Sequence, residues 1–248
     1  SGGSLSSTRV YGSLAYHQMI GFSHLLSFGV SAGWANKRIN ASQLIFPVDF
    51  KGFLANNNKY DFASSYTIPN NNINYVDVQA GLNYAFFPSN TVYINSGLSA
   101  WYLNRPRESF YPDDVPGYNP RIAPRYSFFT NASVKMNNEV ILNPMTYFSI
   151  QNKAKEFLIG ANLQYNLSGN GEKQLYGGLY ARPGDAIIPM IGFELNFLRI
   201  QFTYDITTNG FGNFNNFSTG SYEFSLMRPG FYNLYKGNRR QTLCPSFY

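Results

Sequence analysis

Apolar and polar residues alternate along most of the chain, in blocks of about ten residues separated by turn-forming residues. In the clearest block, Leu26, Phe28, Val30, Ala32 and Trp34 alternate with serine and glycine. Alternation with a period of two is typical of a β-strand whose two faces differ in polarity. About eleven such blocks follow one another, so the sequence predicts an all-β chain of antiparallel strands. The apolar faces lie within residues 10–16, 26–34, 76–84, 92–102, 126–134, 140–148, 157–165, 175–181, 187–193, 200–204 and 222–226.

The charged residues of these blocks avoid the apolar faces. The opposite faces are made of glycine, serine, asparagine and glutamine, and they carry the charges, which are Asp77, Lys135, Glu156, Glu194, Arg199, Asp205 and Glu223. In a soluble sandwich the outer face is rich in charge. In a membrane barrel the apolar face meets lipid, where one Lys or Arg at the midplane costs about 2–4 kcal/mol, and the polar face lines a lumen. The pattern therefore favours a transmembrane antiparallel β-barrel.

The block length agrees with a membrane barrel. Two prolines, however, do not fit a regular strand. Ten residues that rise ~3.3 Å each and tilt by ~40° span about 25 Å, the height of the apolar band of a barrel. Pro144 and Pro189 fall inside blocks and cannot donate to a strand ladder. We expect bulges or local breaks at both.

The connections between blocks alternate between two sets, as in outer-membrane barrels. One set is short and is predicted to be periplasmic: residues 20–24, 88–90, 137–139, 168–173 and 196–198. The other set includes all the long loops and is predicted to be extracellular: residues 35–74, 103–124, 151–155, 182–185 and 207–219. Aromatic rings are favoured at both membrane interfaces. We expect Trp34, Trp101 and Tyr102 at the outer one, and Phe22, Phe86, Phe87 and Phe197 at the inner one.

This orientation makes the first block begin outside the cell. Bacterial barrels have an even strand number and begin in the periplasm, so we expect about three further strands before residue 1 and about fourteen strands when complete. Ser1 to Ser4 show no signal peptide, which predicts that the start is missing or processed. Residues 1–228 are then the barrel, and residues 229–248 are a periplasmic C-terminal tail.

Composition argues against several kinds of binding site. Only 13% of the 248 residues are charged, against roughly 25% in a typical soluble domain. The net charge of +6 does not indicate nucleic-acid binding, because the basic residues form no stripe, although Arg239 and Arg240 are a clustered pair. Cys244 is the single cysteine, which excludes an internal disulfide and a cysteine-based zinc site; we expect a buried or free thiol. The two histidines are scattered, so neither a metal nor a cofactor is predicted.

Catalysis is weakly supported by the sequence. His17 and Ser13 alternate on the polar face of the first block, as a serine–histidine pair of a barrel lipase would. An orienting acid at matched spacing is absent, and a polar lumen accommodates such a pair without chemistry. We therefore predict no catalytic residues. His24 is expected in a short turn, in contact with solvent.

Two long loops are candidates for partner binding. The loop 35–74 is rich in asparagine and contains Tyr60 and Tyr66, and the loop 105–125 contains Tyr111 and Tyr118. Tyrosine and asparagine suit adaptable protein contacts at modest entropic cost. Loops of this length are commonly functional or disordered, so a plugging or mobile loop is the alternative.

The C-terminal tail is a second candidate surface. It carries Lys236, Arg239 and Arg240 and ends with Phe247 and Tyr248. Exposed aromatic residues next to arginine are typical interface anchors, which favours a periplasmic docking segment. The alternative is a strand remnant whose basic residues contact lipid headgroups.

Several short strings stand out along the chain: residues 37–46 with Phe50, 177–182, 185–188 with 191–192, 204–208, 220–226 and 244–247. They cover nearly the whole chain, and in type and order they resemble the PorP/SprF family of type IX secretion system outer-membrane proteins of Bacteroidota. The chain departs from the family at its start, where members carry extra residues and a signal peptide. The resemblance implies a non-enzymatic barrel that supports export or surface attachment of large adhesins, including gliding adhesins.

The same resemblance implies the partners. These are the C-terminal signal domain of a secreted adhesin, periplasmic peptidoglycan-associated lipoprotein or other secretion-system subunits, and outer-membrane lipid. A passive channel or uptake porin is the main alternative, because a polar lumen alone allows it equally well. An outer-membrane lipid enzyme is the third hypothesis.

Overall fold

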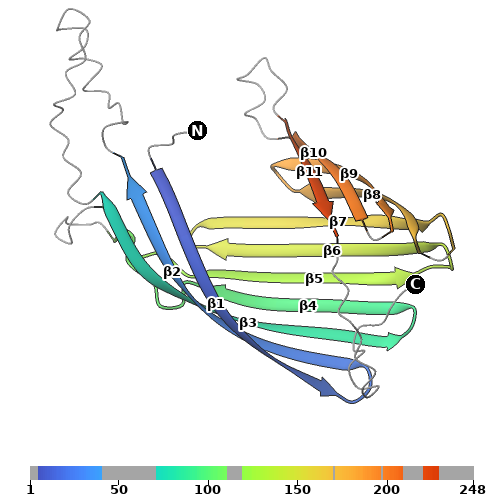
Figure 1. Ribbon diagram of the computed structural model, residues 1–248, viewed down its shortest axis with the longest axis horizontal. Helices are drawn as coiled ribbons and strands as arrows, with labels where there is room; N and C mark the ends of the chain where they lie inside the picture. Colours follow the sequence, from blue (N-terminus) through green and yellow to red (C-terminus); the bar gives the residue numbers. More distant parts are fainter. Residues whose placement is uncertain are drawn as a thin grey trace, which may run out of the picture. The chain divides into compact units, whose positions relative to one another are not determined.

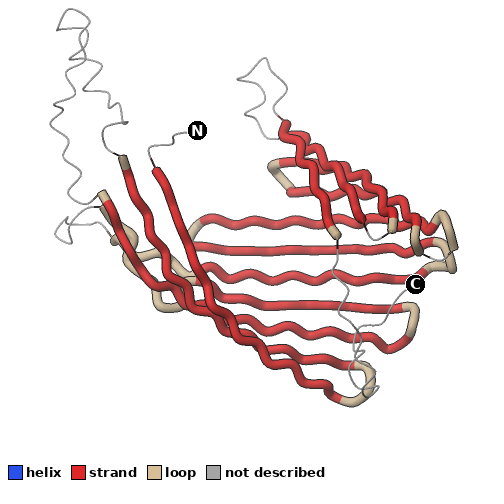
Figure 2. Tube along the Cα trace, in the orientation of Figure 1, coloured by secondary structure: helices blue, strands red, loops and turns tan. Residues whose placement is uncertain are grey.

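The computed structural model describes residues 5–40, 71–110, 119–169, 171–196, 198–208 and 220–228. Every regular element in these ranges is a strand (Figure 2). The strands are β1 (Leu5–Ile20), β2 (His24–Ile39), β3 (Asn72–Ser89), β4 (Val92–Trp101), β5 (Arg125–Lys135), β6 (Val140–Gln151), β7 (Ala154–Asn166), β8 (Lys173–Arg182), β9 (Ala186–Leu195), β10 (Leu198–Thr207) and β11 (Gly220–Met227). Among the described residues, we find no helix with the length and hydropathy to cross a bilayer.

The eleven strands form one antiparallel sheet in which each strand is hydrogen-bonded to its neighbour in the sequence (Figure 1). The predicted all-β fold of eleven antiparallel strands is therefore confirmed. The order begins with β1 and ends with β11, and these two strands are not neighbours in it. Closure of the sheet, the total of about fourteen strands and the division at residue 228 stay predictions.

The two prolines disturb the sheet less than expected. Pro144 pairs with Ala161 in a β6–β7 ladder of constant register, so the predicted bulge is absent from this ladder. Pro189 likewise pairs with Leu179 of β8 without a shift. Toward β10, the ladder lacks a pair at Pro189 but resumes in the same register. The interruption lies where proline has no N–H to donate, so only this break matches the prediction.

The chain divides into two compact units. Unit 1 consists of Ser1–Ala15, Gly29–Ala80 and Ala100–Arg125, and unit 2 consists of Tyr16–Phe28, Gly81–Ser99 and Tyr126–Tyr248. Strands β1 to β4 contribute residues to both units, whereas β6 to β11 belong to unit 2.

Exposure in both units is the reverse of that in a soluble domain. The apolar face of each strand is exposed, as the 41% exposure of Val30 in unit 1 and the 58% exposure of Leu179 in unit 2 illustrate. The largest fully buried side chains are those of Gln174 and Asp77. Soluble proteins bury such groups rarely and only when they are paired. The structure thus confirms the predicted segregation of apolar and polar faces.

His24 corrects one expectation. It is the first residue of β2 rather than part of the turn, which comprises residues 21–23. Its Nδ1 lies 2.6 Å from the hydroxyl of Tyr84, and its ring stacks on Phe86 with centroids 4.8 Å apart. It therefore belongs to an aromatic cluster at the start of β2 and the end of β3, together with Phe86, which the sequence assigns to the inner interface.

Candidate functional site on the polar face

Three of the groups that the described polar side chains form are candidates for a functional site. In unit 1, a group around Glu108 holds a loop against the sheet. In unit 2, one group surrounds Glu194, and a third is a ladder of side-chain amides across β5 to β8.

The loop between β4 and β5 begins and ends as a small hairpin. The N–H of Glu108 donates to the carbonyl of Pro120 at 2.8 Å, and the N–H of Ile122 donates to the carbonyl of Pro106 at 2.9 Å. A bridge between Arg107 and Arg121 lies between these bonds. The two ends of the loop are therefore held together by backbone pairing.

Asn104 joins the hairpin to β3. Its Oδ1 accepts a bond from the N–H of Val78 at 3.2 Å, and its Nδ2 donates to the carbonyl of Val76 at 2.7 Å. The side-chain amide thus provides the donor and the acceptor that a further strand residue would offer to β3. Tyr102 and Arg105 on either side have positive φ values of 56° and 47°, and this left-handed backbone turns the chain out of β4.

Glu108 attaches the hairpin to the polar face. Its carboxylate forms an ion pair with Lys37 of β2 and accepts a bond from the Tyr75 hydroxyl of β3 at 3.0 Å. The Lys37 and Glu108 side chains are 17% and 25% exposed, so water only partly screens the pair. Nearby, the Tyr11 hydroxyl donates to Asp77 at 3.0 Å, and Arg9 donates to the Tyr102 hydroxyl at 3.1 Å. The loop base therefore rests on a charged, hydrogen-bonded group.

The second group centres on Glu194 of β9, which is 3% exposed. Arg199 of β10 donates from Nε to Glu194 at 2.7 Å and from Nη2 to the Tyr176 hydroxyl at 2.7 Å. The Arg199 guanidinium also lies 4.4 Å from the centroid of the Tyr176 ring, a cation–π distance. The Tyr176 hydroxyl is 2.8 Å from Glu194 and 2.6 Å from Gln174, which accepts a bond from Gln164 at 2.5 Å. Four adjacent strands are thus connected by one polar network.

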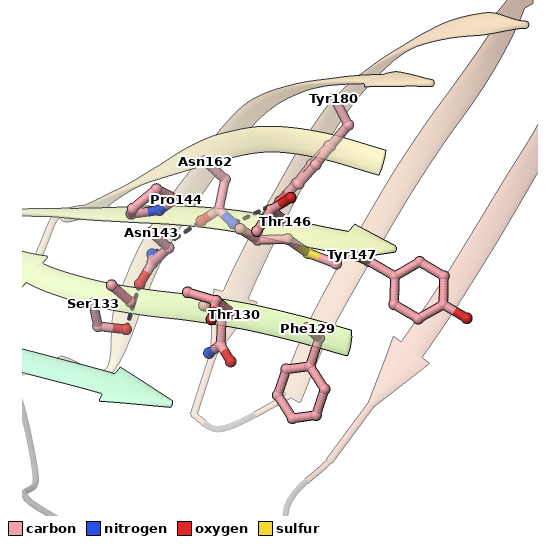
Figure 3. Close-up of a pocket in the computed structure, with 12 residues that line it drawn as sticks. Phe129, Thr130, Ser133, Asn143, Pro144, Thr146, Tyr147, Asn162 and Tyr180 are labelled. Atoms are coloured by element: carbon pink, nitrogen blue, oxygen red, sulfur yellow. Dashed lines mark hydrogen bonds between the residues drawn. The ribbon is translucent and has the colours of Figure 1, made fainter. Parts of the chain in front are cut away.

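The third group is an uncharged ladder. Ser133 of β5 donates to Oδ1 of Asn143 at 2.7 Å, Asn143 donates to Oδ1 of Asn162 at 3.0 Å, and Asn162 donates to the Tyr180 hydroxyl at 2.8 Å (Figure 3). Each bond crosses from one strand to the next, so the ladder runs across β5, β6, β7 and β8.

The nine residues that the sequence predicts for partner binding all lie outside the described residues: Tyr60, Tyr66, Tyr111, Tyr118, Lys236, Arg239, Arg240, Phe247 and Tyr248. Their role stays a prediction. The described hairpin ends at Phe110 and Asn119, directly next to the segment with Tyr111 and Tyr118.

The sequence does not indicate the group around Glu108. In the sequence, Glu108 is an isolated acid in a loop, and Lys37 belongs only to a string that resembles the family. Asn104 carries no signal of its attachment to β3. By contrast, Glu194 and Arg199 were assigned to the polar face, because the period of the strand decides the face of every residue.

His17 and Ser13 do not pair with each other. His17 Nδ1 lies 2.7 Å from Ser27 Oγ in unit 2, and the Ser13 hydroxyl is 2.9 Å from that of Ser31 in unit 1. The described ranges also contain no cluster of three His, Cys, Asp or Glu residues that could hold a metal ion.

Comparison with known proteins identifies the family. No curated protein matches the chain. Nine chains of solved structures match it, and one is the toluene transporter TbuX of Ralstonia pickettii, with 12% identity and a TM-score of 0.43. That match covers 82% of this chain and 62% of the transporter, so the chain spans less than two thirds of its length. The family described as type IX secretion system membrane protein PorP/SprF matches residues 1–227. The chain therefore belongs to the PorP/SprF family of type IX secretion system membrane proteins.

Proposed function

We propose that this membrane protein is a non-enzymatic outer-membrane barrel of the type IX system that binds a large secreted adhesin and anchors it or helps to export it. The exposed apolar face contacts lipid, and the buried polar face lines the interior. From the alternating lengths of the connections, we assign residues 40–71 and 102–124 to the cell exterior and residues 229–248 to the periplasm. Binding is static recognition that requires no covalent chemistry.

The docked hairpin of unit 1 is the observation that carries this proposal. Backbone pairing, Asn104 and the Glu108 ion pair give the segment with Tyr111 and Tyr118 a defined base. Binding through a loop costs less conformational entropy when the ends of the loop are already held. Tyrosine side chains on such a base suit contact with the C-terminal domain of an adhesin.

The C-terminal tail, residues 229–248, is the second proposed binding surface. Lys236, Arg239, Arg240, Phe247 and Tyr248 combine basic and aromatic side chains that suit an interface. We assign them to a periplasmic subunit, such as a peptidoglycan-associated lipoprotein. Two surfaces on opposite sides of the membrane would then couple the exported adhesin to the periplasmic apparatus.

Co-purification from native membranes in mild detergent tests both surfaces. A Tyr111→Ser/Tyr118→Ser variant is expected to lose at least tenfold of the adhesin and to retain the periplasmic partner. A variant with Lys236, Arg239 and Arg240 changed to serine is expected to show the opposite loss, so each variant is the control for the other. Adhesin recovery equal to wild type in the tyrosine variant would contradict the assignment.

Docking of the hairpin also predicts a low conductance in planar bilayers. Glu108→Gln removes the charge that attracts Lys37 while preserving the size of the side chain. We expect more frequent and larger open events for this variant, because the loop base is released from the polar face. Glu223→Gln on β11 is the matched control and is expected to behave like wild type. A steady open pore in the wild-type protein would instead support the passive-channel hypothesis.

A further inference from the structure

A hollow of about 390 Å³ lies on the part of the sheet that carries the amide ladder (Figure 3). Strands β5 and β6 form most of its lining, and β7 and β8 contribute one residue each. This volume is at the lower end of the ~300–1,000 Å³ range of small-molecule sites. None of the twelve lining residues carries a formal charge, which is notable on a face that holds ion pairs elsewhere. The hollow is therefore suited to an uncharged ligand.

The ladder retains hydrogen-bonding capacity after its own bonds are made. An asparagine amide has two N–H donors and two acceptor lone pairs, and Asn143 and Asn162 each use one donor and one acceptor within the ladder. The Tyr180 hydroxyl accepts one of these bonds and has a proton of its own to donate. Paired donors and acceptors of this kind match hydroxyl groups, which both donate and accept.

Asn95 adds an unsatisfied acceptor beside the hollow. Its Nδ2 donates to Oδ1 of Asn131, a lining residue, at 3.3 Å. Its Oδ1 is buried and has no hydrogen-bond partner among the described residues. A buried acceptor without a partner costs about 1–3 kcal/mol. Because Asn95 itself does not line the hollow, its contribution to the site is to hold the Asn131 side chain in the lining.

Two aromatic rings lie against glycines where a side chain would collide with them. A Cβ at Gly97 of β4 would clash with the ring of Phe129, and a Cβ at Gly160 of β7 would clash with the ring of Tyr180. Both rings line the hollow. Their packing against the backbone leaves flat apolar surfaces next to the polar ladder.

From these features we infer that the hollow is a binding site for a neutral saccharide of one or two rings. Phosphates, carboxylates and cations lack a charged partner here, and a pure hydrocarbon would leave the amides without hydrogen bonds. A neutral sugar presents hydroxyl groups along its edge for Asn143, Asn162 and Tyr180. Its C–H faces pack on the flat rings. This site is independent of the proposed adhesin surface.

Saturation-transfer NMR on the full chain tests the site. The protein must be kept in a detergent without a sugar headgroup, such as LDAO, because an alkyl maltoside would compete. Maltose, cellobiose and lactose serve as neutral probes, and glucuronic acid serves as the charged contrast. We expect transfer to at least one disaccharide and none to glucuronic acid.

Two near-isosteric variants test whether the saturation-transfer signal comes from binding at the amide ladder. Asn143→Leu and Asn162→Leu are each expected to weaken saccharide binding about fivefold to tenfold, as expected for loss of about one hydrogen bond. Gln201→Leu on β10, on the same face but outside the hollow, is expected to bind like wild type. Heat-modifiable migration on gels verifies folding, and adhesin co-purification is expected to be unchanged.

The outcomes that overturn this inference are distinct from failure of the adhesin proposal. Absence of transfer to all three disaccharides, or equal affinity in both asparagine variants and wild type, rejects the site. Displacement of the sugar by triglycine blocked at both ends, which carries no charge, at a lower concentration than by a second disaccharide would identify a peptide site instead.

Discussion

Replacing Arg199 with methionine is expected to destabilise the protein by about 3–5 kcal/mol, because it leaves the Glu194 carboxylate buried without its cation. Glu194 is 3% exposed and accepts a bond from Nε of Arg199 at 2.7 Å. The same substitution removes the bond to the Tyr176 hydroxyl and the contact of the guanidinium with the ring. Guanidinium-induced unfolding in lipid vesicles measures the effect.

Two controls separate charge burial from a general effect of losing an arginine. Arg182→Met also breaks an ion pair, with Asp205 at 2.5 Å, but both side chains there are about a quarter to a third exposed. We expect a loss of about 1 kcal/mol or less. Adding Glu194→Gln to Arg199→Met is expected to recover most of the stability, since this network then holds no buried charge. An Arg199→Met variant no less stable than Arg182→Met would contradict the buried-network interpretation.

Replacing Ile191 with arginine is expected to destabilise the protein by about 2–4 kcal/mol, because the proposed function puts lipid against this face, near the middle of β9. Ile191 is 59% exposed and pairs with Gly177 of β8 and Phe202 of β10. At such exposure in water, an arginine would change stability by less than ~0.5 kcal/mol. The size of the destabilisation therefore shows whether the apolar face contacts lipid or water.

Gln201→Arg is the matched control for this substitution. Gln201 lies in β10 next to Phe202, so its side chain points to the opposite face of the same sheet. We expect a change of less than about 1 kcal/mol there, measured by the same unfolding in vesicles. Equal stabilities of Ile191→Arg and wild type would exclude lipid contact at this face.

The strands were predictable because their signal is local. Successive side chains of a strand point to opposite faces, so the exposure of Val30, Leu179 and Ile191 follows from their neighbours in the sequence alone. Pro144 was misjudged because the cost of a proline depends on the ladder in which its nitrogen lies. That detail requires the partner strand and the register.

The candidate site was less predictable, since it depends on side chains from separate strands and loops. Glu108 reaches Lys37 and Tyr75 across 71 and 33 residues of sequence. Asn104 completes the hydrogen bonding of β3 from a loop 26 residues away from Val78. The tyrosines that the sequence proposes for partner binding belong to the two long loops and lie outside the described residues. The described residues show how the base of one loop is held.

The sequence by itself determined the number of strands, their antiparallel order and which face of each strand is apolar, because all three depend on a period of two and on the turns between blocks. Tertiary structure decided which polar groups meet: the buried Glu194 and Arg199, the ladder from Ser133 to Tyr180, and the docking of Glu108. A buried carboxylate or amide must find a partner, but its identity is decided by strand register and loop path, which no local pattern contains.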